Sequence, residues 1–173
     1  LTKQVNAFKL LEDYRPNIVI MAAAKCGGIL ANKNNPATFL RDNLLININT
    51  YDACLAFGVE KVIALGSVCM YPFSCPIPFK EKDIFAGKPE LTNFPYGESK
   101  RVLYLLGKTY REQYGLKSVF LVPVNMFGEA DHFDLENSHV IPAMIAKFCQ
   151  AKRNNLLKVR LFGTGTACRE FVH

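Results

Sequence analysis

Tyr96 and Lys100 are spaced so that they could act together in acid–base chemistry. They lie four positions apart, which is one turn of a helix. A tyrosine donates a proton to a carbonyl effectively when its pKa, about 10 unperturbed, is lowered, and a nearby lysine can lower it by its charge. Tyr104 and Lys108 have the same spacing. Because only Tyr96 follows Pro95 at a predicted helix start, we interpret Tyr104 as a packing residue.

Ser67 could complete this set, because it follows a short apolar run that is typical of a strand. Three such runs, rich in β-branched residues, occur at Ile18–Met21, Val62–Leu65 and Ser118–Val122. We expect each run to be a strand that is buried on both faces. Since ligands bind beyond the carboxyl ends of strands in open α/β sheets, Ser67 could hydrogen-bond the same substrate oxygen as Tyr96.

Helical periodicity fills the segments between these runs. Pro36 can occupy a first helical turn, and the apolar period then predicts a helix within Asn35–Phe57. A second helix is predicted over Tyr96–Tyr114, with Gly115 as its stop. The alternation of strands and helices predicts an α/β fold, with a Rossmann-like parallel sheet and helices on both faces.

The remaining segments are a long loop and a short C-terminal unit. The proline-rich loop Tyr71–Phe94 should border a site, since loops of this length inside a domain are usually functional. A further helix is expected over Val140–Lys152, followed by a short strand over Lys158–Phe162 and a turn over Gly163–Gly165.

Small residues follow all three predicted strands, in the segments Ala22–Gly28, Gly66–Cys69 and Pro123–Gly128. Glycines and alanines let a backbone approach a flat or anionic ligand closely. One such cluster is ordinary turn chemistry, but three at one edge of a sheet favour a ligand site.

Three longer phrases, together with the Ser/Tyr/Lys set, resemble the GDP-L-fucose synthase family of the extended short-chain dehydrogenase/reductase superfamily. The phrases are Ala23–Ile29, Gly66–Pro72 and Asn137–Ala143, and the likeness extends from about Ile18 to His173. The Ser-x-Cys motif, combined with the motif Asn-Ser-His-Val-Ile-Pro later in the chain, is specific to this family within the superfamily. The resemblance implies 3,5-epimerisation and NADPH-dependent 4-keto reduction of GDP-4-keto-6-deoxymannose. It also implies a homodimer that packs through the two predicted long helices.

The resemblance assigns roles to five catalytic residues. Tyr96 protonates the C4 oxygen as NADPH delivers hydride, Lys100 lowers the pKa of this tyrosine and holds the nicotinamide ribose, and Ser67 hydrogen-bonds the same oxygen. Cys69 and His139 are the acid/base pair that moves protons at C3 and C5. A thiol and an imidazole suit that task because both titrate near neutral pH. Without the resemblance, Cys69 is typical of a small buried residue and His139 of an ordinary surface or core histidine.

The resemblance also implies binding residues. The cofactor-binding positions for NADP(H) are Ala23, Ala24, Leu65, Gly66, Tyr96, Lys100, Pro123, Asn125, Met126 and His139. The nucleotide-sugar positions are Lys147, Phe162 and Arg169. The family usually has Arg at 147, Trp at 162 and Thr at 124, where this chain has Val124. A lysine lacks the bidentate fork and a phenylalanine lacks the N–H donor, so we expect a retuned pocket. No metal site is expected.

Two domains are implied. Residues 1–135 correspond to an NADP-binding Rossmann-like domain, and residues 136–173 to the beginning of a nucleotide-sugar-binding domain. The family opens with a strand, a Gly-rich turn and a helix that hold the dinucleotide pyrophosphate. We expect this unit, and the closing part of the substrate domain, to lie outside the 173 residues, as if the chain were cut at both ends.

The composition is that of a globular domain, with 50% hydrophobic residues, 21% charged residues and a net charge of +6. No apolar run is as long as a membrane span, and the polar start is helix-like rather than a secretory signal, so we expect a cytoplasmic protein with no membrane partner.

The six cysteines are scattered, which favours free thiols. The basic residues form no stripe, which argues against a nucleic-acid partner.

The sequence is also compatible with two alternative functions. One is a related nucleotide-sugar 4-epimerase or 4,6-dehydratase, although those enzymes typically lack the cysteine two residues after the serine and the histidine phrase. The other is a short chain without the Gly-rich turn, acting as a non-catalytic nucleotide-sugar-binding or dimer-forming partner of a full-length enzyme.

Overall fold

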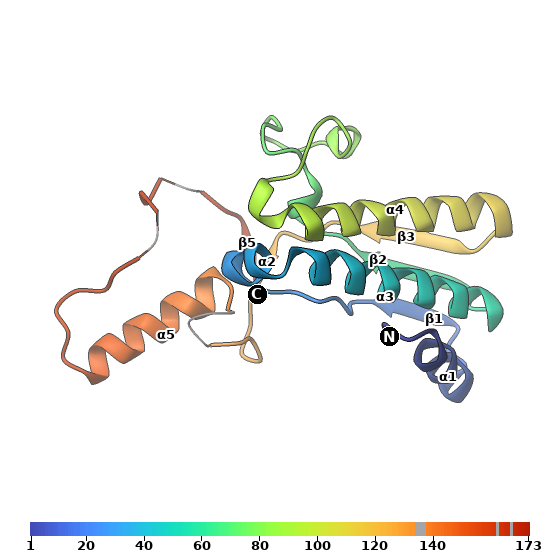
Figure 1. Cartoon of the computed structure of the whole chain (residues 1–173), viewed down its shortest axis with the longest axis horizontal. Coiled ribbons are helices and arrows are strands. Elements are labelled where there is room, and N and C mark those ends of the chain that lie inside the picture. Colours follow the sequence, from blue (N-terminus) through green and yellow to red (C-terminus); the bar gives the residue numbers. More distant parts are fainter. Residues whose placement is uncertain (134–137, 162, 167) are drawn as a thin grey trace.

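A three-stranded parallel sheet forms the centre of the computed structural model, which describes residues 1–133, 138–161, 163–166 and 168–173. Its strands β1 (Ile18–Met21), β2 (Lys61–Leu65) and β3 (Lys117–Leu121) lie side by side in the order of the sequence. Parallel strands place their carboxyl ends at the same edge (Figure 1). The predicted α/β fold with a parallel sheet is confirmed.

Two helices of 21 residues, α3 (Pro36–Ala56) and α4 (Phe94–Tyr114), connect these strands. Both begin with a proline in the first turn, where its missing N–H costs nothing. The chain turns after each helix at a glycine with a left-handed backbone, Gly58 at φ +69° and Gly115 at φ +73°. Both predicted long helices are therefore confirmed, including their start and stop signals.

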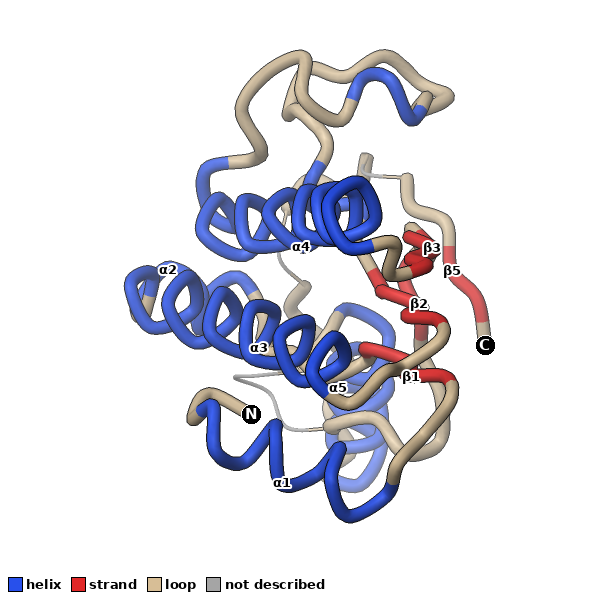
Figure 2. Tube along the Cα trace, turned by 90° about the vertical axis from the view of Figure 1, so that its right-hand side faces the viewer, coloured by secondary structure: helices blue, strands red, loops and turns tan. Residues whose placement is uncertain are grey.

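The helices α1 (Gln4–Tyr14), α3 and α4 lie on one side of the sheet (Figure 2). The core between these layers is built from buried residues of both, namely Ala7, Leu11, Tyr51, Ala53, Cys54, Val62, Ala64 and Leu103. On the opposite face, alternate strand residues are exposed, for example Ile20 (64%) and Leu121 (47%). The prediction that all three strands are buried on both faces was wrong, because the described helices cover one face.

The C-terminal part differs from the prediction in one element. α5 (Val140–Arg153) matches the predicted helix and projects away from the sheet (Figure 1). The predicted strand Lys158–Phe162 was wrong, because residues 158–161 form no strand, and Phe162 lies outside the described residues. A second parallel sheet instead pairs β4 (Asn125–Met126) with β5 (Phe171–Val172), so the backbone partner of β4 comes from the end of the chain.

The proline-rich segment between η1 (Val68–Met70) and α4 contains two further 3-10 helices, η2 (Glu81–Asp83) and η3 (Leu91–Asn93). Its two sides are joined by a bridge between Pro72 and Pro89. A six-residue helix that the sequence did not predict, α2 (Ile29–Asn34), leads from the glycines after β1 into α3.

The described residues include no helix that is long and apolar enough to cross a membrane. All six cysteines are free thiols, as expected from their scattered positions.

Candidate active site

Ser67, Cys69, Tyr96 and Lys100 converge at the carboxyl end of β2. The Lys100 ammonium donates a hydrogen bond to the carbonyl of Leu65 over 2.8 Å and lies 5.6 Å from the centre of the Tyr96 ring. The Ser67 hydroxyl accepts a hydrogen bond from the backbone N–H of Cys69 over 3.2 Å. A strand end and one helix thus bring together four of the five predicted catalytic residues.

Two glycines allow the close packing that builds this cluster. A Cβ atom on Gly97 would lie 2.4 Å from the carbonyl oxygen of Cys69, so α4 can approach this backbone only through a glycine. A Cβ atom on Gly66 would lie 2.6 Å from the Phe120 ring. The Gly66 N–H also donates to the carbonyl of Leu121 over 2.7 Å, which fixes the strand end against β3.

The pKa of Tyr96 is raised above its ordinary value. Burial is the largest cause and contacts with Cys26 add to it, whereas the polar side chain of Ser67 acts to lower the pKa. This direction is opposite to the expected lowering by Lys100, because the Lys100 ammonium is bonded to the Leu65 carbonyl and burial dominates. A tyrosine is protonated at neutral pH with or without this shift, and a raised pKa makes Tyr96 a weaker proton donor than an ordinary tyrosine, so the shift itself does not favour proton donation.

Lys100 is a buried cation, with 4% of its surface exposed, and burial lowers its pKa. An ammonium has three N–H donors, and among the described residues only the Leu65 carbonyl is bonded to it. The remaining donors could bind the hydroxyls of a ribose. Ala23, Ala24 and Gly66 at the same edge would let a flat ring approach the backbone. These residues fit the nicotinamide end of a dinucleotide cofactor.

Cys69 is half-buried, and burial raises the pKa of its thiol, although the polar side chain of Ser67 opposes the rise. The pKa near neutral that the sequence analysis expected for this thiol was therefore too low. His139 is exposed and lines a cavity of about 170 Å³ together with Ala24 and Gly27. The fifth predicted catalytic residue thus borders the cluster from the start of α5.

Cys26 is a site residue that the sequence analysis did not single out. Its sulfur lies 3.6 Å from the Tyr96 hydroxyl oxygen, and it also lines the cavity that His139 borders. Cys26 therefore connects the two parts of the site. Asp131 and His132, which were also not predicted, line the same cavity. The signal that could have identified Cys26 is its position among the small residues after β1.

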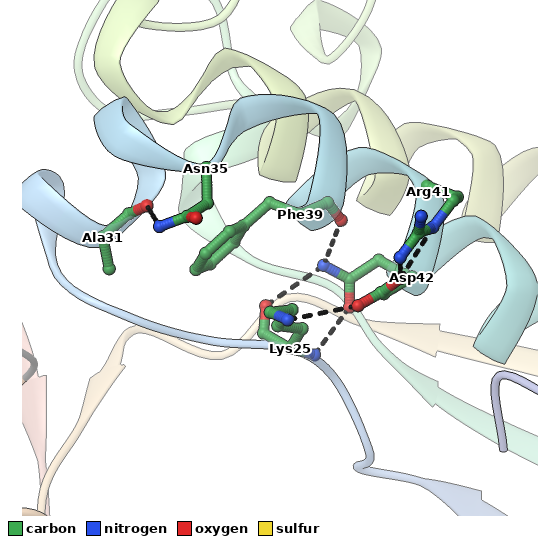
Figure 3. A network of polar contacts seen from close by, with 7 residues as sticks. Lys25, Ala31, Asn35, Phe39, Arg41 and Asp42 are labelled. Atoms are coloured by element: carbon green, nitrogen blue, oxygen red, sulfur yellow. Dashed lines mark hydrogen bonds and ion pairs between the residues drawn. The ribbon is translucent and has the colours of Figure 1, made fainter.

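The loop after β1, which carries Ala23 and Ala24, is held by α3 (Figure 3). The side chain of Asn43 accepts a hydrogen bond from the N–H of Lys25 over 2.7 Å and donates one to its carbonyl over 3.1 Å. The Asp42 carboxylate pairs with the Lys25 ammonium over 3.1 Å, and the Arg41 and Lys25 cations lower the pKa of Asp42. This loop is therefore fixed before any ligand binds.

The other predicted binding residues lie farther along the chain. Pro123 is half-buried before β4, and Met126 is exposed in it. Asn125 binds the Glu170 carbonyl through both its backbone and its side-chain N–H groups, at 3.3 and 3.0 Å. Phe162 lies outside the described residues, as does the boundary drawn between residues 135 and 136.

Of the predicted nucleotide-sugar residues, Lys147 lies on α5, which projects away from the sheet (Figure 1), and Arg169 lies two residues before β5. The Lys147 ammonium donates a hydrogen bond to the Arg160 carbonyl over 3.4 Å. The Arg169 guanidinium donates one to the carbonyl of its neighbour Cys168 over 2.7 Å. Over the described ranges, no three His, Cys, Asp or Glu side chains are grouped so that they could hold a metal ion.

The whole chain, residues 1–173, matches the model of the NAD dependent epimerase/dehydratase family. It is 41% identical to the GDP-L-fucose synthase of Sinorhizobium fredii (strain NBRC 101917 / NGR234), over 100% of this chain and 55% of that protein. It is also 41% identical to the probable GDP-L-fucose synthase 1 of Oryza sativa subsp. japonica, over 100% of this chain and 53% of that protein.

Among solved structures, a crystal structure of a GDP-L-fucose synthetase from Naegleria fowleri bound to NADP matches with a TM-score of 0.88 and 34% identity. The match covers 99% of this chain and 56% of that chain. The chain thus spans about half the length of the curated relatives it matches.

Proposed function

Because the chain belongs to the NAD dependent epimerase/dehydratase family, we propose that its protein uses NADPH to convert GDP-4-keto-6-deoxymannose into GDP-L-fucose by 3,5-epimerisation and 4-keto reduction. The observation that carries this proposal is the Ser67, Tyr96 and Lys100 cluster beside the Cys69 thiol at one sheet edge. The names of the relatives and the NADP in a similar structure support the substrate and the cofactor.

The cluster can assist reduction of a ketone. When bound, NADPH supplies the hydride to the ketone carbon. Tyr96, which is protonated at neutral pH, donates its proton to the oxygen that becomes an alcohol, and the Ser67 hydroxyl hydrogen-bonds that oxygen. The Lys100 ammonium, 5.6 Å from the Tyr96 ring, stabilises the negative charge that develops on the tyrosine.

Cys69 and His139 are the proposed residues for epimerisation. Protons next to a ketone are acidic, so a base can remove one from C3 or C5 and an acid can return one to the opposite face. Since burial raises the pKa of Cys69, its thiolate is a strong base once formed. His139 borders the cavity beside Cys26, where it can exchange protons with solvent.

The remaining cofactor-binding assignments are also part of the proposal. Ala23, Ala24, Leu65 and Gly66 would contact the nicotinamide from the ends of β1 and β2. Pro123, Asn125, Met126 and His139 would contact it from the side of β4 and α5. We assign Lys147, Phe162 and Arg169 to the nucleotide-sugar side of the site.

We further propose that the protein is a cytoplasmic homodimer that packs through α3 and α4. Apolar side chains are exposed on both helices, at Leu45, Ile48 and Leu55 of α3 and Leu105 of α4. Such residues suit an interface core. Light scattering on the native protein checks this proposal, and a monomer at micromolar concentration would contradict it.

Solvent-exchange kinetics test the proposed reaction. The native protein that carries this sequence is incubated with GDP-4-keto-6-deoxymannose in deuterated water, with and without NADPH. We expect deuterium at C3 and C5 without NADPH, and oxidation of NADPH with formation of GDP-L-fucose when it is present. A 4-epimerase would incorporate no deuterium at these positions, and a non-catalytic partner would bind the nucleotide sugar without turnover.

A further inference from the structure

Arg101 is a cation of α4 that is almost completely buried, with 6% of its surface exposed. Its Nε donates to the carbonyl of Met70 over 2.8 Å, and its Nη2 donates to the carbonyl of Gly87 over 2.7 Å. Its Nη1 donates to the Glu98 carboxylate over 3.0 Å. A buried guanidinium is tolerated only when its donors and charge are satisfied, so these contacts account for its position.

The two carbonyls that Arg101 binds come from the two sides of the proline-rich segment. Met70 directly precedes this segment, and Gly87 lies on its returning side, next to Lys88, whose carbonyl accepts a hydrogen bond from Phe73 over 3.0 Å. The ring of Phe85, from the same segment, lies 5.5 Å from the guanidinium carbon. One side chain therefore fixes the start and the returning side of the segment to α4.

The contact with Met70 also determines where Cys69 lies. Gly97, one helical turn before Arg101, packs directly against the Cys69 carbonyl, which a Cβ atom would approach to 2.4 Å. Arg101 then binds the next carbonyl along the chain. We propose that Arg101 is a positioning residue that holds the Cys69 thiol in register with Tyr96. This inference rests on the proposed function, in which Cys69 moves protons at C3 and C5.

A guanidinium is suited to this task, and an ammonium is not. The planar fork of an arginine presents donors in several fixed directions, so it can bind two backbone carbonyls and a carboxylate together. A lysine presents a compact charge and reaches fewer of these acceptors at once. Arg101→Lys should therefore fail to restore what Arg101→Met removes.

The first test separates the two half-reactions in the native protein. In Arg101→Met, we expect deuterium exchange at C3 and C5 to fall by about 10- to 100-fold, since a small misplacement of a reacting group can cost this much. NADPH oxidation is measured with the already epimerised 4-ketone, so that it does not depend on proton exchange at C3 and C5, and it should change less than about threefold, because Tyr96 and Lys100 are held by contacts of their own. The control is Arg111→Met, an exposed arginine of the same helix, which should change neither rate. An equal loss of both reactions in Arg101→Met overturns the proposal.

The second test does not depend on activity. Alkylation by iodoacetamide is followed for each cysteine by peptide mass spectrometry, and Arg101→Met should speed modification of Cys69 about tenfold, as expected for losing one charged hydrogen bond. Cys54, which is fully buried, reports global unfolding, and the exposed Cys149 of α5 reports reagent strength. Both should be unchanged.

The two tests have distinct failures. An unchanged rate at Cys69, or an equal acceleration at Cys54, would show that Arg101 does not position this thiol specifically. If the unsubstituted protein exchanges no protons at C3 and C5, the proposed function is wrong, and the alkylation rates still decide whether Arg101 holds the segment.

Discussion

Lys100 binds the carbonyl of Leu65, the last residue of β2, through a hydrogen bond of 2.8 Å. This contact joins the helix that carries Tyr96 to the sheet edge at which the strands end. Because Lys100 is buried, its ammonium has given up most of its hydration, and each remaining donor gains by binding a ligand hydroxyl. The position of Lys100 thus links the fold to the proposed cofactor site.

Replacement of Lys100 by methionine should weaken NADPH binding by about tenfold, which corresponds to one charged hydrogen bond. Methionine keeps the apolar stem but removes the ammonium donors. The dissociation constant is measured by the quenching of NADPH fluorescence on the native protein. Lys108→Met is the matched control, because Lys108 is an exposed lysine of the same helix that pairs with Glu112. Equal weakening in both variants would contradict the role of Lys100.

Tyr96→Phe should slow NADPH oxidation by about 100-fold or more, since general acid catalysis contributes on this scale. Deuterium exchange at C3 and C5 should persist, because we assign it to Cys69 and His139 in the proposed function. Tyr104→Phe is the control, since the Tyr104 ring packs against Phe120 with centroids 5.4 Å apart. If Tyr104→Phe lost as much reduction as Tyr96→Phe, the choice between the two Tyr/Lys pairs would be wrong.

The main elements could be predicted because their signals are local. Three apolar runs became β1, β2 and β3, and α3 begins at Pro36 and ends before Gly58, as the sequence pattern indicated. The pairing of β4 with β5 could not be predicted, since strands of two residues have no periodicity and Phe171 is distant in sequence from its partner Asn125.

The site was predictable in part for the same reason. Ser67 follows a strand, and Tyr96 and Lys100 share one helix turn, so spacing alone brings them together. The contact between Cys26 and Tyr96 joins the ends of separate elements, and no local pattern marks it. The direction of the Tyr96 pKa shift depends on burial, which the sequence does not reveal.

The exchange reaction should become faster as the pH rises above neutral. Burial raises the pKa of Cys69 above the ordinary thiol value of 9.0, so the fraction of thiolate, the basic form, increases tenfold for each pH unit below that pKa. Initial rates of deuterium incorporation between pH 6 and pH 9, a range set by the thiol reference value, test this expectation. A plateau near pH 7 would mean that the thiol is already ionised there, contrary to the effect of its burial.

Asn43 should contribute to the free energy of unfolding by about 1–3 kcal/mol, because Asn43→Ala would leave the N–H and the carbonyl of Lys25 without their partner. Asn43 is 2% exposed, so water cannot replace its amide without rearrangement. Urea unfolding of the native protein measures this difference. Asn35→Ala is the control, since Asn35 is exposed and its side chain donates to the nearby Ala31 carbonyl, as Figure 3 shows.

Because Lys25 lies beside Ala23 and Ala24 in the same loop, Asn43→Ala should also weaken NADPH binding, whereas Asn35→Ala should not. If the two variants lost equal stability and bound NADPH equally well, the loop after β1 would owe its position to other contacts.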